Sequence, residues 1–390
     1  MEWMLTPAKS FSSVLENVDE QFFAKCASEY ALSLVSLVVE QYGTEAATDP
    51  DQLSSMLNHP LGSSHLPLWC PELGHCLAAL KKTKLSNAQR GLTQIVLNLL
   101  SAGIPGTWTI DLAEPMSLRW DRFLLPKALR LEVHNDGKEA HIRTHNADSG
   151  QLLEFHAISN GKVEWHSPDA EAIPYLELVD NRALLLSGLQ SEEMEFPETV
   201  LPGVPAITDT HKRHLSAAID LFREQFPTWT PWFDRVLRTI TVSESSPEGI
   251  HSGTREGFYG SIWISDCDDL LKVAESLIHE ASHQYYFLLS RLVDLTNDDG
   301  RRFYSPFVDT QRPPDKLLLA YHAFTNVEMF YRECLRIDLK AAQCERVLEQ
   351  LKRELGHTQQ VLSKEIDLTP VGRCIFDTLH AYRSSYGNPN

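Results

Sequence analysis

Residues 269–294 read DLLKVAESLIHEASHQYYFLLSRLVD, and they contain an H-E-x-x-H pattern between His279 and His283. Apolar residues recur along this stretch at helical spacing, which predicts one long helix. The preceding segment 260–265, GSIWIS, is short and mostly apolar, and it predicts a strand. This part of the chain is therefore predicted to fold as a strand followed by a helix that buries one apolar face.

The two histidines of this pattern are the first candidates for a metal site. Residues four positions apart lie on one face of a helix, so the imidazoles of His279 and His283 can bind the same metal ion. The alternative is a solvated or core histidine pair without a metal. Two imidazoles leave a metal ion under-coordinated, so a metal site here requires a third protein ligand.

The apolar stretch 317–334 offers two candidates for the third ligand, His322 and Glu328. His322 lies 39 residues after His283, in a segment where a neutral imidazole is uncommon without a partner. We therefore predict His322 as the third metal ligand. Glu328 or another residue is the alternative, and His322 could instead be a core histidine bonded to a backbone carbonyl.

The loop between the two predicted helices includes YSPFVDTQRP at residues 304–313. Two prolines and two aromatic residues make it stiff, and Arg301, Arg302 and Arg312 surround it in an acidic chain. A guanidinium near a metal ion can bind the carboxylate of a substrate or co-substrate through two parallel hydrogen bonds. The alternative is a surface loop with ordinary ion pairs.

The composition is that of a globular protein. The chain has 390 residues, of which 43% are hydrophobic and 23% are charged. Its net charge of −18 argues against nucleic acid or an anionic membrane as the main partner, because both favour clustered Lys and Arg. The seven cysteines are scattered without a CxxC pair, and we find neither a secretory signal nor a run of eighteen apolar residues. We expect a cytoplasmic protein without a transmembrane helix.

The fold class is predicted as α+β and mainly helical, in three regions. Residues 1–128 are expected to be mostly helical, with a long periodic segment at 15–42. Residues 129–204 are expected to form an antiparallel β-meander, because apolar and polar residues alternate there and Asn-Asp-Gly at 135–137 is a strong hairpin turn. Residues 205–390 are expected to form the helical, metal-binding catalytic region that carries the HExxH motif.

These motifs resemble a family of HExxH-motif proteins encoded beside ribosomally synthesised, modified peptides. In that family an L-x-H-E-x-x-H helix follows a short strand, and a loop of the form Y-[SA]-P-W-R-D-x-x-R-P and an apolar helix come next. The matching residues are Leu277, His279, Glu280, His283, Tyr304, Ser305, Pro306, Asp309, Arg312, Pro313, Phe324 and Phe330. The resemblance covers about residues 258–335. This chain departs from the pattern at Phe307 and Val308, where Trp and Arg are usual, which leaves Arg312 as the arginine of the loop.

Some members of that family are iron(II)- and 2-oxoglutarate-dependent oxygenases that hydroxylate a side-chain β-carbon in a precursor peptide. The resemblance implies the same class here: a dioxygenase of natural product (RiPP) biosynthesis that uses iron, 2-oxoglutarate and O2 on a ribosomally synthesised precursor peptide. In this scheme His279, His283 and His322 bind the iron, and Arg312 binds the distal carboxylate of 2-oxoglutarate. Glu280 orients a ligand or a water molecule.

Two other functions fit the same residues. In a zinc metallopeptidase, the histidines would bind Zn²⁺ and Glu280 would be the general base that activates water. In a metal-free peptide-binding module, the same region would hold a precursor peptide without catalysis. The three functions differ in their need for a metal ion, O2 and 2-oxoglutarate.

Overall fold

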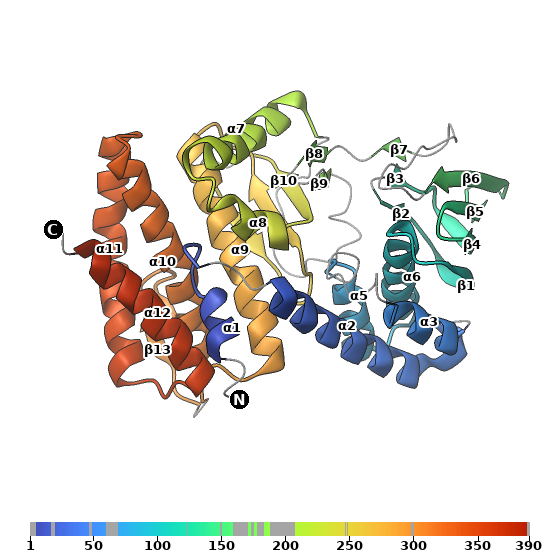
Figure 1. The fold of residues 1–390 in the computed structure, drawn as a ribbon, viewed down its shortest axis with the longest axis horizontal. Helices are drawn as coiled ribbons and strands as arrows, with labels where there is room; N and C mark the ends of the chain where they lie inside the picture. Colours follow the sequence, from blue (N-terminus) through green and yellow to red (C-terminus); the bar gives the residue numbers. More distant parts are fainter. Residues whose placement is uncertain are drawn as a thin grey trace.

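The computed structural model shows an α+β fold that is mainly helical, with antiparallel strands in the middle of the chain and helices in the C-terminal part, which confirms the predicted fold class. In Figure 1 an antiparallel sheet lies at one end of the molecule and a group of long helices lies at the other. The structure describes residues 5–16, 20–46, 49–59, 69–121, 123–148, 150–158, 171–172, 175–177, 183–187, 207–245, 247, 249–297 and 300–387.

Helices dominate the first hundred residues, as the sequence predicts. They are α1 (Leu5–Ser10), α2 (Glu20–Tyr42), a 3₁₀ turn (Gly43–Glu45), α3 (Pro50–Leu57), α5 (Leu73–Lys82) and α6 (Leu85–Ser101). The periodic segment at 15–42 corresponds to α2, whose apolar residues are buried in the core. By length and composition alone, residues 20–45 could cross a membrane, but the core helix of a soluble protein passes the same test, and 44% of the apolar window is buried here.

The meander sheet begins earlier than predicted. Its antiparallel strands, in the order β1-β4-β5-β6, are β1 (Gly106–Met116), β4 (Ala128–Asn135), β5 (Glu139–Asn146) and β6 (Leu152–Ile158). The expectation of a mostly helical region up to residue 128 is therefore wrong for β1, where Trp108, Ile110 and Leu112 alternate with exposed residues. The hairpin turn at 135–137 is confirmed, and Gly137 adopts a φ of +93° there.

A second, mixed sheet lies beneath the HExxH helix. Its order is β11-β12-β10-β9-β8, from strands β8 (Tyr175–Glu177), β9 (Ala183–Ser187), β10 (Thr239–Ser243), β11 (Ser252–Thr254) and β12 (Ser261–Ser265). β10 runs parallel to both β9 and β12. The prediction that β8 and β9 continue the meander is wrong: β9 is a continuous apolar run, which suits a strand buried on both faces beside a parallel neighbour.

The predicted region boundaries at residues 128 and 204 separate strands that belong to the same sheet. β1 precedes the first boundary and pairs with β4 after it, while β9 and β10 lie on either side of the second. Residue 204 itself lies outside the described residues. A small sheet, β2-β3-β7, is formed by Arg119–Trp120, Phe123–Leu124 and Glu171–Ala172.

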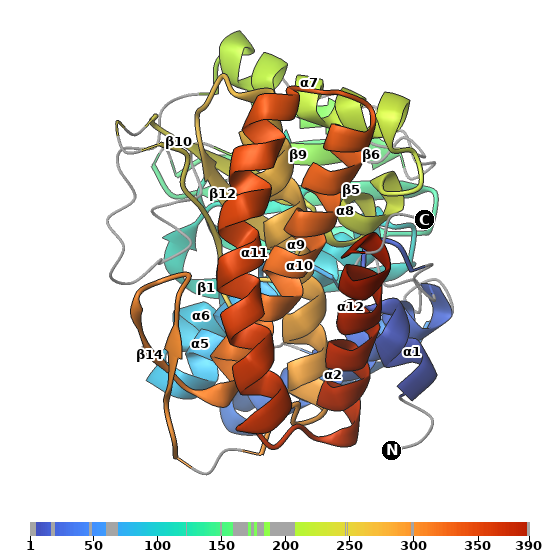
Figure 2. The same cartoon turned by 90° about the vertical axis from the view of Figure 1, so that its left-hand side faces the viewer.

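Long helices form the C-terminal part. They are α7 (Asp209–Gln225), α8 (Thr230–Val236), α9 (Leu270–Leu292), α10 (Pro314–Arg336), α11 (Ala341–Lys364) and α12 (Pro370–Gly387), and the hairpin β13 (Phe303–Ser305) and β14 (Thr310–Arg312) joins α9 to α10. In Figure 2 α10 lies among α9, α11 and α12, and it packs against all three. The HExxH helix α9 is thus enclosed by α10 on one side and by β11 and β12 on another.

Candidate metal site on helix α9

Helix α9 begins at a well-formed cap. The Asp269 carboxylate accepts hydrogen bonds from the backbone N–H groups of Leu271 and Lys272, which have no partner within the helix. The apolar residues of the helix form a stripe that is buried in the core. The cap and the buried stripe fix the rotation of the helix, and so decide which way His279 and His283 point.

The two histidines of the motif lie together, as the sequence predicts. Their ring centroids are 4.5 Å apart and the ring planes meet at 84°, and each ring is partly exposed. The His279 ring contacts the Phe324 ring of α10 edge-on at 4.6 Å, and the Phe307 ring of the hairpin loop stacks on Phe324 at 4.1 Å. An aromatic pair therefore covers one side of the histidine pair, and neither ring is among the residues predicted from the sequence to form the site.

Both histidines are neutral at physiological pH. Burial lowers the pKa of His279 to about 4. Burial also lowers the pKa of His283 well below its usual value, and the nearby positive charges of Lys316 and Arg312 contribute to this shift. The Nδ1 atom of His283 is buried and has no hydrogen-bond partner among the described residues. Because metal ions bind the neutral imidazole, the pair is in the protonation state that a metal site needs.

Arg312 lies near the histidine pair. Arg312 ends strand β14, and its charge lies close enough to His283 to influence the pKa of that imidazole. Within the described part of the chain Arg312 makes no ion pair, whereas the Nζ of Lys316 lies 3.0 Å from the Asp315 carboxylate. Lys316 is a second cation near the histidines. It follows Arg312 by only four residues, but it is not among the residues predicted from the sequence to form the site.

His322 lies in the core and is anchored to the N-terminal segment. Its side chain is 1% exposed, and its Nε2 lies 2.9 Å from the backbone oxygen of Phe11. Because a carbonyl oxygen only accepts, the Nε2–H group donates to it, and the neutral ring keeps its lone pair on Nδ1. Nδ1 has no hydrogen-bond partner among the described residues. A metal-bound histidine usually has this kind of hydrogen bond on its second nitrogen.

The three histidines do not surround a common point. Among the residues that the structure describes, no three His, Cys, Asp or Glu side chains are grouped so that they could hold a metal ion. The donor set therefore fits a metal ion at two positions, His279 and His283. His322 lies near this pair, since electrostatic coupling to its imidazole contributes to the lowered pKa of both other histidines.

Glu328, the other candidate for the third ligand, forms ion pairs with two arginines. Its carboxylate is 1% exposed, and its two oxygens lie 2.6 Å from Arg332 and 2.6 Å from Arg383. Each oxygen thus already accepts a charge-assisted hydrogen bond. This arrangement makes Glu328 a link between α10 and α12 rather than a free donor.

Glu328→Gln is expected to lower the free energy of unfolding by about 3 kcal/mol, because it leaves Arg332 and Arg383 without their buried partner. Its metal content should equal that of the parent protein. The matched control is Glu349→Gln, which breaks an exposed Glu–Arg pair with Arg353 and should cost less than about 0.5 kcal/mol. Urea denaturation and metal analysis give both values, and a loss of metal in Glu328→Gln would make the glutamate a ligand.

Glu280 faces the mixed sheet. Its carboxylate is 1% exposed, and Oε1 accepts a hydrogen bond of 2.7 Å from the Ser252 hydroxyl on β11. Oε2 is buried without a partner among the described residues. Burial raises the pKa of Glu280 to about 8, against which the Ser252 hydrogen bond acts only partly. Before any metal binds, Glu280 is therefore a neutral acid at pH 7.

Acid is expected to destabilise the metal-free protein through His322. Its pKa is about 4 in the folded protein and about 6.5 when unfolded, so the folded state binds fewer protons and stability falls as pH drops from 6.5 to 4. The full loss is about 3.5 kcal/mol, since the shift is about 2.5 pKa units at about 1.4 kcal/mol per unit. Urea midpoints at pH 7.5 and pH 5, measured with a chelator present, should differ less in His322→Gln than in the parent. Equal differences would show that His322 does not carry this effect.

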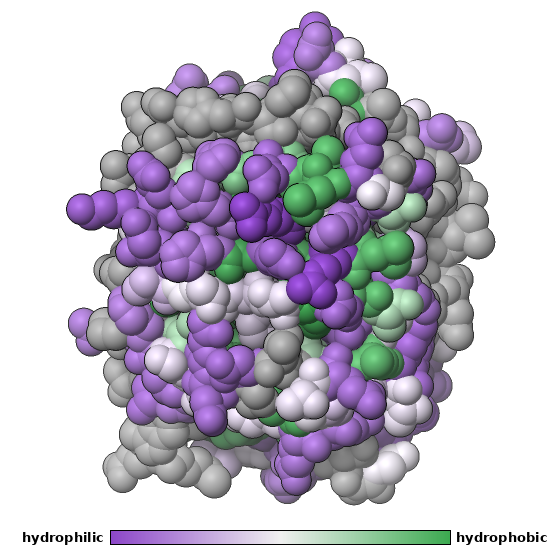
Figure 3. Space-filling model, turned by 90° about the vertical axis from the view of Figure 1, so that its right-hand side faces the viewer, coloured by the Kyte–Doolittle hydropathy of each residue, from purple (hydrophilic) through white to green (hydrophobic). Residues whose placement is uncertain are grey.

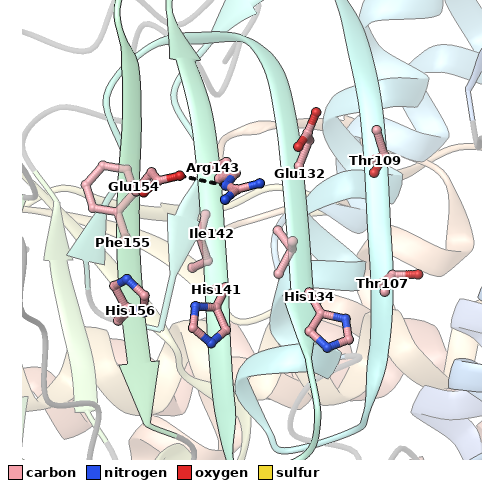
Figure 4. Close-up of a pocket in the computed structure, with 11 residues that line it drawn as sticks. Thr107, Thr109, Glu132, His134, His141, Ile142, Arg143, Glu154, Phe155 and His156 are labelled. Carbon is pink, nitrogen blue, oxygen red and sulfur yellow. Dashed lines mark hydrogen bonds and ion pairs between the residues drawn. The ribbon is translucent and has the colours of Figure 1, made fainter.

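A second histidine pair lies on the meander sheet, on the side of the molecule shown in Figure 3, which is mainly hydrophilic with small apolar patches. His134, His141 and His156 occupy one cross-strand row over β4, β5 and β6, beside a hollow of about 320 Å³ (Figure 4). The His141 and His156 rings are 4.5 Å apart at 83°, almost the same geometry as in the HExxH pair. All three side chains are exposed, so this pair differs from the HExxH pair in its surroundings rather than in its spacing.

Comparisons with known proteins add no family to this picture. No protein-family model matches the chain, and a comparison with curated proteins finds no match. The HExxH-family resemblance therefore remains an expectation that rests on the motif residues of α9 and the following loop.

Proposed function

We propose that the chain is an iron(II)- and 2-oxoglutarate-dependent oxygenase that hydroxylates a side-chain β-carbon in a ribosomally synthesised precursor peptide. The observation that carries this proposal is the pair of neutral, partly exposed imidazoles of His279 and His283, with the charge of Arg312 beside them, which makes no ion pair with any residue that the structure describes. The neutral pair offers nitrogen ligands, and the guanidinium offers a partner for a dicarboxylate co-substrate.

The proposed roles follow from these positions. His279 and His283 would hold the iron, with His322 proposed as the third ligand, and the bound iron would supply the chemistry that inserts oxygen into a C–H bond. Arg312 would bind the distal carboxylate of 2-oxoglutarate and so orient the co-substrate. The stacked rings of Phe324 and Phe307 would exclude water from one side of the pair. Overall, the peptide C–H group, O2 and 2-oxoglutarate become a C–OH group, succinate and CO2.

Glu280 is the residue that separates this proposal from a zinc peptidase. A general base must reach the water molecule that it activates. The Glu280 carboxylate is 1% exposed and hydrogen-bonded to Ser252, so it is poorly placed for that role. A positioning role fits better: the Glu280–Ser252 bond ties α9 to β11 beside the histidines. The seven free cysteines agree with a reducing compartment, and we propose that the protein acts in the cytoplasm.

The decisive assay is mass spectrometry of the precursor peptide encoded beside this chain, incubated with the iron-loaded protein. The expected product is a peptide heavier by one oxygen atom, formed only when O2 and 2-oxoglutarate are both present, with succinate released in equal amount. Glu280→Gln should keep part of this activity, since it preserves a partner for Ser252. Peptide fragments formed without O2 or 2-oxoglutarate would overturn the proposal in favour of the peptidase, and binding without any product would favour a peptide-binding module.

A further inference from the structure

A second site with distinctive chemistry lies at the start of helix α6, where it meets β1 and the loop after β11. A hollow of about 140 Å³ opens there, lined among others by His75, Lys84, Ser86, Arg90 and Arg255. This is less than half the volume of a pocket for a drug-sized ligand, so it can enclose one small charged group but not a whole nucleotide.

Positive charge gathers around this hollow although the chain carries a net charge of −18. Among the residues that the structure describes, Lys84, Arg90 and Arg255 line it together with one acidic residue, Glu114. Arg90 and Arg255 both lie close enough to His75 to act on it: burial lowers the pKa of His75 to about 3, and the two guanidinium charges contribute. His75 is therefore neutral, and the described lining residues include three cations and one carboxylate.

Aromatic packing holds one of the cations in place. The Arg255 guanidinium lies 4.6 Å from the centroid of the Phe258 ring, which in turn contacts His75 edge-on at 5.7 Å. A guanidinium stacked on a ring loses little further freedom when it binds an anion. Arg255 is thus pre-organised at the wall of the hollow.

The N-terminus of α6 adds donors to the same hollow. Lys84 is the N-cap residue of this 17-residue helix, and its side chain makes no capping hydrogen bond. The backbone N–H groups of the first turn carry a partial positive charge there. Ser86 lies in that turn and is 7% exposed, and its buried hydroxyl has no hydrogen-bond partner among the described residues. A buried hydroxyl without a partner is costly, and an anion in the hollow would supply its acceptor.

We propose that this hollow binds a phosphate group. The three cations and the helix N-terminus match a dianion with several acceptor oxygens better than a single carboxylate. The Lys84 Nζ lies 3.3 Å from the Glu114 carboxylate, so Glu114 partly neutralises one of the cations. The site is separate from the HExxH histidines and does not depend on the proposed oxygenase activity.

Isothermal titration calorimetry of the full chain tests the site with inorganic phosphate and with glycerol phosphate, at constant ionic strength set with chloride. One site per chain is expected. Arg90→Met and Arg255→Met should each weaken binding at least about tenfold, and Ser86→Ala about threefold. Glu114→Gln should tighten binding about threefold, an effect that a folding defect cannot imitate. Tighter glycerol phosphate than inorganic phosphate would identify a phosphate monoester as the ligand, and the reverse order would identify free phosphate.

The matched control is Arg130→Met, which removes an arginine on the meander sheet that is ion-paired with Asp111 and Glu132. It makes the same change in net charge and should leave phosphate binding unchanged. No heat beyond the chloride baseline, an equal loss in Arg130→Met, or succinate binding as tightly as phosphate would each overturn the proposal. Circular dichroism of every variant verifies that the fold is retained.

Discussion

Replacing His279 or His283 with Ala is expected to remove the metal ion from the protein. The parent chain should hold about one metal ion after anaerobic loading with Fe(II), and each variant should bind it at least about 100-fold more weakly. The effect is large because only these two imidazoles lie together on the metal-binding face of α9, so neither can be replaced by a neighbour. Peptide hydroxylation should be lost together with the metal.

The matched control for this result is the double variant His141→Ala, His156→Ala. That pair has the same ring spacing of 4.5 Å, but it is exposed on the open meander sheet. It should keep the metal content and the activity of the parent. Metal retained in both α9 variants, or lost in the meander variant, would move the metal site away from the HExxH motif.

Arg312→Ala is expected to raise the 2-oxoglutarate concentration needed for half-maximal activity by about 30-fold or more, with the metal still bound. Arg312 lies beside His283 and makes no ion pair in the described part of the chain, so its charge is available to a dicarboxylate. Arg312→Lys should restore only part of the effect, because an ammonium cannot form two parallel hydrogen bonds. The measurement is the rate of succinate formation as a function of 2-oxoglutarate concentration, for the parent protein, Arg312→Ala and Arg312→Lys.

Arg301→Ala is the control for Arg312. Arg301 precedes the same hairpin, but its guanidinium lies over the Phe303 ring and donates to the backbone oxygen of Glu365. Its removal should leave the 2-oxoglutarate requirement unchanged. If Arg312→Ala behaves like Arg301→Ala while Lys316→Ala shows the large shift, the co-substrate is held by the lysine.

Local signals in the sequence were enough to predict the helix that carries the motif and the hairpin turn of the meander. A run of apolar residues at helical spacing and an Asn-Asp-Gly turn depend on near neighbours, which the sequence contains directly. β9 was assigned to the wrong sheet because strand pairing depends on distant partners: its parallel neighbour β10 lies more than fifty residues later. β1 was missed although Trp108, Ile110 and Leu112 alternate with exposed residues.

In the candidate site, too, local features could be predicted from the sequence and contacts between distant residues could not. Sequence spacing alone brought His279 and His283 together, because one helical turn separates them. The surroundings of His322 could not be predicted, since its partner is the backbone of Phe11, 311 residues away. The same holds for Glu328, whose second arginine comes from α12. The phosphate hollow is lined by residues of α5, α6, β1 and the loop after β11, so no single sequence motif predicts it.

The contacts between the N-terminal segment and α10 determine how late during translation this part of the fold can form. Phe11 accepts from His322, and the Val14 N–H donates to the Asn326 side chain, so residues made first contact residues made more than 300 positions later. At about 5–20 residues per second, the ribosome needs on the order of tens of seconds to bridge that interval. During this time Phe11 can already pack against Phe22 and Phe23 of α2, but Phe11 and Val14 lack their partners on α10. The histidine site can therefore be completed only after α10 has been synthesised.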